Sequence, residues 1–343
     1  MLYTRRDVGK IALASVPAAR LMAAAKPNSL FGGVQIGAIT YSFRGLPATA
    51  EDTLKYCLQC GISAIELMSG PADSFAGAPS GGRGGGMPGG GMPGGAPGGG
   101  RGQQQQTPEQ QAARLKAQQE LRTWRETVSM DKFKAFRKMY NDAVVKIYAY
   151  KLEPNMTMSD GEYAYIWNVA QALGANHVTM ELPTDDKLLA RVAAYAEKRK
   201  LRIAFHTHCQ GGSSGFDRVL NASKYTALNL DVGHYFGVNG ESPAPLVEKY
   251  ADRIASLHLK DRAAPPPATA PAGAEAGRCG PGLGGANMPW GQGGTPLKEV
   301  LLLMKKKKYK FPGSIEYEYQ TPQGSDVLTE ITKCVEYCKN ILV

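Results

Sequence analysis

The residues best suited to chemistry are histidines and carboxylates at the ends of short apolar runs. Four of the five histidines follow or end predicted strands, and carboxylates hold similar positions in neighbouring strands. The histidines are His206, His208, His234 and His258, and the carboxylates are Glu66, Glu181, Asp231 and Glu316. In a barrel of parallel strands such ends converge on one mouth, so a shared site is predicted there.

Mixed imidazole and carboxylate ligands indicate one divalent metal ion. Mn, Zn, Co or Fe suit such ligands better than Mg or Ca, which favour all-oxygen sites. The candidate ligands are the strand-end histidines and carboxylates given above. Side chains alternate along a strand, so His206 and His208 share the inward direction and either can be the ligand. Whether His206 or Glu181 completes the set stays open from the sequence.

Strand-like and helical segments alternate along most of the chain. The predicted strands are 34–42, 62–68, 143–151, 177–182, 202–208, 227–232, 254–260 and 314–319. The predicted helices are 53–60, 108–127, 130–140, 161–173, 185–200, 216–223, 245–252, 297–306 and 327–341. No break long enough for a domain boundary separates them. We therefore expect an α/β fold, a single (β/α)8 TIM barrel over residues 34–343.

Two low-complexity tracts, residues 76–106 and 263–294, interrupt this alternation. The first is mostly Gly, Pro, Met, Arg and Gln, and the second is rich in Ala, Pro and Gly. Neither can bury enough apolar surface to offset its chain entropy, so both are predicted to be mobile loops. They follow the second and seventh strands and would lie at the catalytic mouth, either as lids or as inert insertions. For the first tract an inert insertion is favoured.

Residues 1–25 resemble a twin-arginine export signal. Arg5 and Arg6 precede a weakly apolar stretch, interrupted by Arg20, that ends in three small residues, Ala23-Ala24-Ala25. The alternative is an ordinary basic N-terminal helix. Export predicts a periplasmic protein. No run of roughly 20 apolar residues follows, so no stable membrane association after export is expected.

The charge and the cysteines add little to the functional assignment. The net charge is +10, but much of the excess lies at the N-terminus and in a lysine run at 305–310, which is typical of a solvated helix end. Nucleic acid is therefore not the predicted partner. Cys57 and Cys60 lack a second CxxC pair, so they are interpreted as buried helix thiols, like Cys334 and Cys338.

Three motifs resemble the sugar phosphate isomerase/epimerase family of the xylose-isomerase-like TIM barrel superfamily, which also contains endonuclease IV. They are Leu230-Asp231-Val232-Gly233-His234, Leu257-His258-Leu259-Lys260-Asp261 and Ser314-Ile315-Glu316-Tyr317-Glu318. The resemblance runs from about residue 34 to the C-terminus, apart from the two tracts. It implies that Asp231, His258 and Glu316 bind the metal. The first glutamate ligand of the family falls at His206, a departure from the pattern.

This departure changes the chemistry that the resemblance implies. Ketose epimerases of the superfamily use two carboxylates on opposite faces of the reacting carbon, and here the partner of Glu316 is missing unless Glu181 replaces it. Isomerisation, dehydration or β-elimination needs only one base and one acid. The resemblance thus implies a divalent-metal-dependent isomerase, epimerase or lyase that acts on a sugar or keto-sugar through a metal-bound enediolate.

The resemblance and the strand positions together assign roles. Catalytic roles are predicted for Glu316, Glu181, His206 and Lys260, and substrate binding for His208, His234, Lys260, Glu66 and Trp290. Lys260 would neutralise a developing oxyanion, or else form an ion pair with Asp261 or a nearby carboxylate. The alternatives are a non-catalytic carbohydrate-binding barrel and an endonuclease IV-like nuclease; the nuclease is disfavoured because the first three strands carry no histidine. The predicted partner is a small-molecule carbohydrate, and a homo-oligomer is left open.

Overall fold

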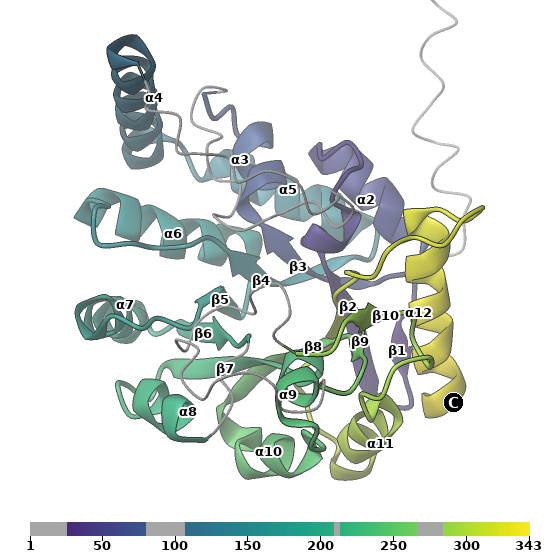
Figure 1. The fold of residues 1–343 in the computed structure, drawn as a ribbon. Helices are drawn as coiled ribbons and strands as arrows, with labels where there is room; N and C mark the ends of the chain where they lie inside the picture. Colours follow the sequence, from purple (N-terminus) through teal and green to yellow (C-terminus); the bar gives the residue numbers. More distant parts are fainter. Residues whose placement is uncertain (1–25, 80–106, 209–212, 266–283) are drawn as a thin grey trace, which may run out of the picture.

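The fold is a closed barrel of eight parallel strands, seen here in a computed structural model that describes residues 26–79, 107–208, 213–265 and 284–343. The barrel strands are β2 (Val34–Ile39), β3 (Ala64–Met68), β4 (Lys146–Lys151), β5 (His177–Glu181), β6 (Arg202–His206), β7 (Thr226–Asp231), β8 (Ile254–Leu259) and β11 (Gly313–Ile315). They follow the chain order around the barrel, and β2 pairs with both β11 and β3, which closes it (Figure 1). The short β1 (Leu30–Phe31) lies antiparallel to β2. The predicted barrel is confirmed.

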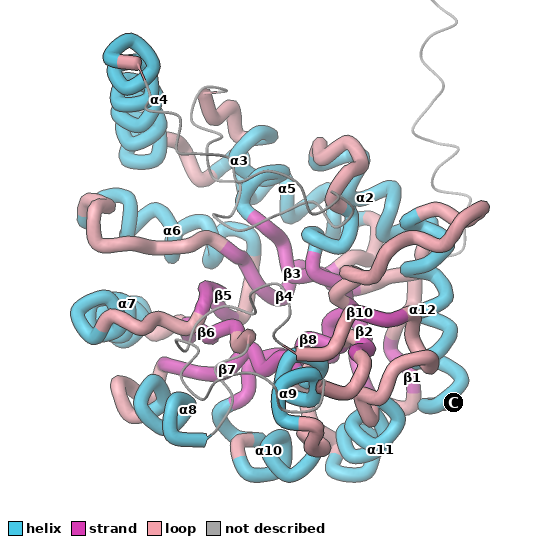
Figure 2. Tube along the Cα trace, in the orientation of Figure 1, coloured by secondary structure: helices cyan, strands magenta, loops and turns pink. Residues whose placement is uncertain are grey.

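Helices surround the strands, which form the inner ring in Figure 2. They are α2 (Ala50–Gln59), α3 (Ser69–Phe75), α4 (Pro108–Thr127), α5 (Asp131–Asp142), α6 (Asp160–Leu173), α7 (Asp186–Arg199), α8 (Ser213–Leu220), α9 (Val232–Asn239), α10 (Ala244–Lys249), α11 (Leu297–Lys307) and α12 (Val327–Leu342). Two short 3-10 turns are η2 (Thr40–Phe43) and η4 (Ala251–Arg253). Each predicted helix is present, whereas α3 and α9 were not predicted. None of the described helices is long and apolar enough to cross a membrane.

Local sequence sets the ends of α6. The Ser159 hydroxyl accepts a hydrogen bond from the backbone N–H of Glu162, and the Glu162 carboxylate accepts one from the backbone N–H of Ser159. This reciprocal capping box satisfies two N–H groups that the first helical turn leaves without partners. The helix ends at Gly174, whose φ of 74° lies in the left-handed region that favours glycine.

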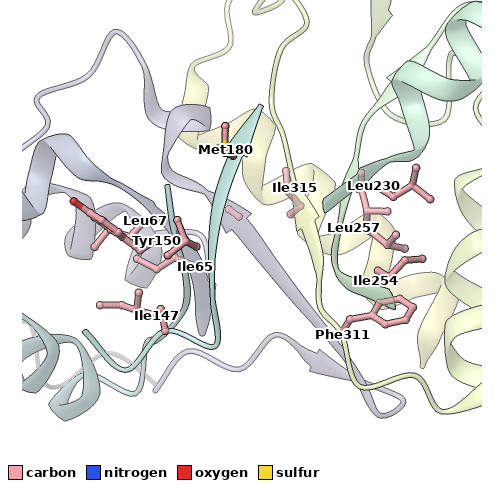
Figure 3. Close-up of a cluster of buried hydrophobic side chains, with 14 of the residues drawn as sticks. Ile65, Leu67, Ile147, Tyr150, Met180, Leu230, Ile254, Leu257, Phe311 and Ile315 are labelled. Atoms are coloured by element: carbon pink, nitrogen blue, oxygen red, sulfur yellow. The ribbon is translucent and has the colours of Figure 1, made fainter. Parts of the chain in front are cut away.

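Apolar strand residues face the helices, and polar residues alternate with them and face the barrel interior. In β3, Ile65 and Leu67 join the hydrophobic core while Glu66 lies between them. In β8, Leu257 and His258 show the same alternation. Figure 3 shows this apolar layer on two walls of the barrel, with Ile65, Leu67, Ile147 and Tyr150 on β3 and β4, and Leu230, Ile254 and Leu257 on β7 and β8. The strands are thus apolar toward the helices and polar within.

Two register irregularities lie beside the interior residues Glu66 and Asn229. Ile65 pairs with Ile147 but Glu66 pairs with Ala149, so β4 carries one additional residue. Likewise, the pairing of β7 with β8 shifts between Leu228 and Asn229. Such bulges re-aim side chains and are frequent next to functional sites. Here Asn229 Nδ2 donates to Glu66 Oε2 at 2.9 Å across the interior.

The second low-complexity tract is not irregular throughout. β9 (Asp261–Arg262) pairs antiparallel with β10 (Asn287–Met288). The Asp261 carboxylate accepts backbone hydrogen bonds from Gly291, Gly293 and Thr295 at 2.8–3.1 Å. Residues 284–294 are thus a loop that contains one short strand and is held by backbone hydrogen bonds to Asp261, which composition does not reveal. Residues 80–106 and 266–283 of the two predicted loops lie outside the described residues.

A buried carboxyl group joins α3 to the barrel wall and to α6. Asp73 Oδ1 accepts hydrogen bonds from the hydroxyls of Tyr150 at 3.2 Å and Tyr165 at 2.7 Å. The side chain is 9% exposed. Burial outweighs these hydrogen bonds and raises the pKa of Asp73 to about 6.

Because this pKa lies above its unfolded value, the protonated carboxyl stabilises the fold below pH of about 4, and this contribution is lost as pH rises through about 6. Asp73→Asn keeps the accepting oxygen and removes the titration. Relative to wild type, the free energy of unfolding of this variant should therefore rise by about 2 kcal/mol between pH 4 and 7. Urea denaturation across that range measures it, with the exposed Asp252→Asn as control. A difference that stays constant with pH would contradict the assignment.

Candidate metal centre

Four buried side chains from consecutive strands converge at one end of the barrel. His206, Asp231 and His258 lie at or near the carboxyl ends of β6, β7 and β8, and Glu316 directly follows β11. One potential ligand atom from each lies within 4.8 Å of the others. The sheet order places β6, β7, β8 and β11 side by side, so the parallel register itself brings these four residues together.

Asn229 fixes the orientation of the His206 ring. The Asn229 amide NH2 donates to Glu66 and to Ser256 Oγ, so its carbonyl oxygen is the atom that faces His206. His206 Nδ1 lies 2.9 Å from this oxygen and must carry the proton. Burial holds the pKa of His206 well below its usual value, so the ring is neutral. His206 Nε2 therefore keeps a free lone pair, as a metal ligand requires.

His258 lies between two carboxylates. Its Nδ1 is 2.6 Å from Glu316 Oε2, and its Nε2 is 2.9 Å from Glu66 Oε2. Thr179 donates a further hydrogen bond to the other oxygen of Glu66 at 2.7 Å. Burial opposes both charges, but the ion pair outweighs it, lowering the pKa of Glu66 to about 2 and raising that of His258 to about 10. Glu66 thus orients His258 from beneath the cluster.

Lys260 brings a buried positive charge to the same carboxylates. Its Nζ lies 2.9 Å from Asp231 Oδ2, 2.9 Å from Glu316 Oε2 and 2.7 Å from Glu318 Oε2. Burial opposes the charge, but these carboxylates raise the pKa of Lys260, so the ammonium persists. The alternative of an ion pair with a nearby carboxylate is confirmed, but the partners are these three, while the Asp261 carboxylate accepts backbone amides instead.

His234 lies beside Lys260 on the unpredicted helix α9. Asp231 caps this helix and accepts the backbone N–H of His234 at 2.7 Å. The His234 Nε2 atom lies 3.0 Å from Lys260 Nζ, and Arg262 contacts its Nδ1. Burial and these neighbouring cations hold the pKa of His234 well below its usual value. The ring therefore stays neutral between two positive charges.

A second charged group adjoins the four residues. Glu181, at the end of β5, lies 2.7 Å from Lys151 Nζ and 2.9 Å from His208 Nδ1. Burial opposes ionisation of Glu181, but Lys151 and the histidines outweigh it and hold its pKa well below the usual range. The His208 side chain is 23% exposed, so it is open to the mouth. Its ring lies 4.6 Å from that of His206 and 4.7 Å from that of His234.

The four converging residues fit one divalent ion. The Asp231 Oδ2 atom is buried and has no hydrogen-bond donor with suitable geometry among the described groups, although Lys260 Nζ lies 2.9 Å away. A metal ion would accept an electron pair from this carboxylate oxygen and another from His206 Nε2. Lys260 has Glu318 as a third carboxylate partner, so it keeps an ion pair when Asp231 and Glu316 bind a metal.

Comparison with known proteins agrees with this architecture. The sequence profile of the family described as xylose isomerase-like TIM barrel matches residues 169–336, the part of the chain that holds all four residues. The fold is that of a xylose isomerase-like TIM barrel. The resemblance predicted from the three motifs is thus confirmed. None of the curated proteins matches the sequence significantly.

Solved structures share this xylose isomerase-like fold at low sequence identity. A xylose isomerase domain protein from Planctomyces limnophilus has a TM-score of 0.55 and 11% identity, covering 92% of this chain and 98% of its own. The probable 3-DHS dehydratase AsbF of Bacillus anthracis has a TM-score of 0.55 and 14% identity, covering 88% and 98%. An L-ribulose 3-epimerase has a TM-score of 0.53 and 12% identity, covering 90% and 94%.

The xylose isomerase-like barrel brings most of the predicted site residues together, but not all in the predicted positions. Glu181 and His208 lie beside the four-residue group rather than within it. Glu66 lies beneath His258, fully buried, instead of lining an open pocket. The Trp290 ring packs against Tyr337 of the outer helix α12, with ring centroids 5.7 Å apart.

Sequence reasoning missed four residues of this centre: Lys151, Asn229, Arg262 and Glu318. Two of them carried a usable signal. Asn229 precedes Asp231 by two positions and Glu318 follows Glu316 by two, so strand alternation places each on the inward face beside a predicted ligand. Lys151 and Arg262 are recognisable only from their contacts.

Asn229→Ala should weaken metal binding about 10- to 100-fold, because His206 would lose the partner that fixes its tautomer and ring plane. Competition between the protein and a fluorescent chelator for Mn²⁺ or Zn²⁺ measures this affinity. Ser256→Ala is the matched control, since Ser256 also contacts Asn229 but none of the four residues. Equal metal affinities of wild type and Asn229→Ala would show that Asn229 does not orient His206 for metal binding.

Proposed function

We propose that this protein is a divalent-metal-dependent isomerase, epimerase or lyase acting on a sugar or keto-sugar. The observation that carries the proposal is the convergence of His206, Asp231, His258 and Glu316 within 4.8 Å at the strand ends. The mouth of a TIM barrel is where such enzymes place their chemistry. The L-ribulose 3-epimerase and the probable dehydratase share the fold. By analogy, they support an epimerase and a lyase, respectively, as candidate reaction classes.

The metal would polarise a carbonyl and an adjacent hydroxyl of the substrate, which acidifies the hydrogen on the carbon between them. The residues of the chain then handle the proton and the developing charge. Lys260 keeps its ammonium charged and lies 2.9 Å from Glu316, so it can donate to a substrate oxygen on which negative charge develops. His234, whose Nε2 lies 3.0 Å from Lys260 Nζ, would hold this ammonium in position.

We assign the proton transfer to the paired Glu181 and His208. Neither belongs to the group of His206, Asp231, His258 and Glu316, so the proposed metal does not need either of them as a ligand. Glu181 Oε2 lies 2.9 Å from His208 Nδ1, and Lys151 keeps Glu181 charged. A carboxylate and an imidazole at this distance are the kinds of group that take and return a proton in such reactions. The pair thereby supplies the second acid–base group that the histidine at position 206 does not.

Glu316→Gln should reduce turnover at least about 10²-fold, because it removes a carboxylate that serves as ligand or base. A panel of keto-sugars incubated in D2O, with and without a chelator, tests the reaction class through deuterium at the carbon beside the carbonyl. Wild type should exchange and lose exchange with the chelator. Glu336→Gln, on the exposed face of α12, is the control. Turnover without exchange or chelator sensitivity contradicts the proposal.

His206→Glu separates metal binding from chemistry. A carboxylate is also a competent ligand, so this variant should bind the metal within about tenfold of wild type. The altered charge should still slow turnover, because the Asn229 carbonyl oxygen accepts a hydrogen bond from the imidazole and would instead face a carboxylate. Metal content and rate are measured on the same preparation. Restored or increased turnover would point to two-carboxylate epimerisation.

We further propose that the protein is exported to the periplasm through the twin-arginine signal in residues 1–25, which lie outside the described residues. Replacing Arg5 and Arg6 together with lysine should leave the precursor in the cytoplasm and cut periplasmic protein at least about tenfold. Immunoblots of fractionated cells measure this, and Arg20→Lys is the control. Periplasmic accumulation of the double variant at the wild-type level would show that Arg5 and Arg6 do not direct export.

A further inference from the structure

A hollow of about 600 Å³ lies at the end of the barrel opposite the metal centre. The amino ends of five neighbouring strands, from β5 to β8 and β11, surround it. Its lining is Asn176, His177, Lys200, Arg202, Tyr225, Ala251, Asp252, Ile254, Ala255, Lys308, Tyr309, Lys310, Phe311 and Pro312. The volume lies within the range of small-molecule sites in proteins. The centre described above uses none of these residues.

The hollow carries an excess of positive charge. Four cationic side chains line it, Lys200, Arg202, Lys308 and Lys310, against the single carboxylate of Asp252. Within the described ranges of the chain, none of these four cations forms an ion pair. Cations gathered without partners in a concave surface raise the local concentration of anions.

The backbone holds two of these lysines in an unfavourable conformation. Lys200 and Lys308 end α7 and α11 with φ of 51° and 57°. Glycine is the usual residue at such left-handed helix ends, because side chains other than glycine are strained there. Only one other described non-glycine residue, Val144, has a positive φ. Both strained lysines thus line the same hollow, at positions where glycine would suit the backbone better.

The positive charge of the hollow also changes the pKa of neighbouring side chains. Burial chiefly lowers the pKa of His177, and Arg202 lowers it further. Arg202 also lowers the pKa of Arg253, after burial, although Arg253 is held by the backbone carbonyls of Leu220, Ser223 and Thr226. An anion placed among these groups would relieve the repulsion.

We propose that this hollow, the amino-end pocket, binds a small organic or inorganic polyanion that carries two or more carboxylate or phosphate groups. Lys200, Arg202, Lys308 and Lys310 would pair with the anionic groups, and the Tyr225 and Tyr309 rings would pack against the body of the ligand. The pocket is separated from the metal centre by the length of the barrel strands. It is therefore a second site, distinct from that of the proposed reaction.

Titration calorimetry with two probes, trigalacturonate for carboxylates and tripolyphosphate for phosphates, tests this proposal on the full chain. Wild type should bind at least one of them at a single site, more weakly as salt rises. Lys200→Gly combined with Lys308→Gly should weaken that binding at least tenfold while thermal stability is kept or increased, because glycine suits both backbone conformations. Arg202→Gln combined with Lys310→Gln is the second variant and should weaken it similarly.

Two controls separate the pocket from overall charge and from the metal centre. Lys132→Gln combined with Lys298→Gln removes the same charge from exposed positions on α5 and α11 and should bind like wild type. Glu316→Gln should also bind like wild type, whatever its effect on turnover. The proposal is overturned if neither probe binds, if the pocket variants bind like wild type, or if the charge control loses as much affinity as they do.

Discussion

The ion pair between Glu66 and His258 lies in the barrel interior, where neither side chain meets water. Removing one partner of such a buried pair typically costs about 3–5 kcal/mol, because the other charge is left without compensation. Glu66 also accepts hydrogen bonds from Thr179 and Asn229, and Asn229 in turn holds His206. Two of the four converging residues therefore depend on one carboxylate of β3, on a strand that contributes no ligand itself.

This dependence explains why the barrel interior is polar. Many TIM barrels fill this space with branched apolar side chains, which pack without directional constraint. Here the chain of hydrogen bonds from Glu66 continues through Asn229 and Ser256 to His177. Hydrogen bonds fix ring planes and tautomers in a way that apolar packing cannot. The polar interior therefore keeps the imidazoles at the mouth in one orientation.

Much of the architecture follows from the sequence, because the strands are short apolar runs whose polar interruptions mark their inward faces. The same logic located His206, Asp231, His258 and Glu316. Strand alternation did not reveal that Glu66 pairs with His258. It predicts that a side chain points inward, but not which residue it meets across the barrel. Helix α9 was missed because Asp231 both ends a strand and caps the helix. The order in residues 284–294 was missed because it comes from Asp261, which lies outside that segment.

The pairing of β9 with β10 has a consequence for how this chain can diverge. It ties residues 261–262 to residues 287–288, so the segment between them begins and ends at adjacent points beside Lys260. The entropy of closing a loop grows slowly, by about 0.6 kcal/mol for each doubling of length. A change in the number of residues between β9 and β10 therefore costs little free energy of folding and keeps the two paired strands beside Lys260. Insertions can accumulate at this point of the chain while the strands that position His206, Asp231, His258 and Glu316 stay unchanged.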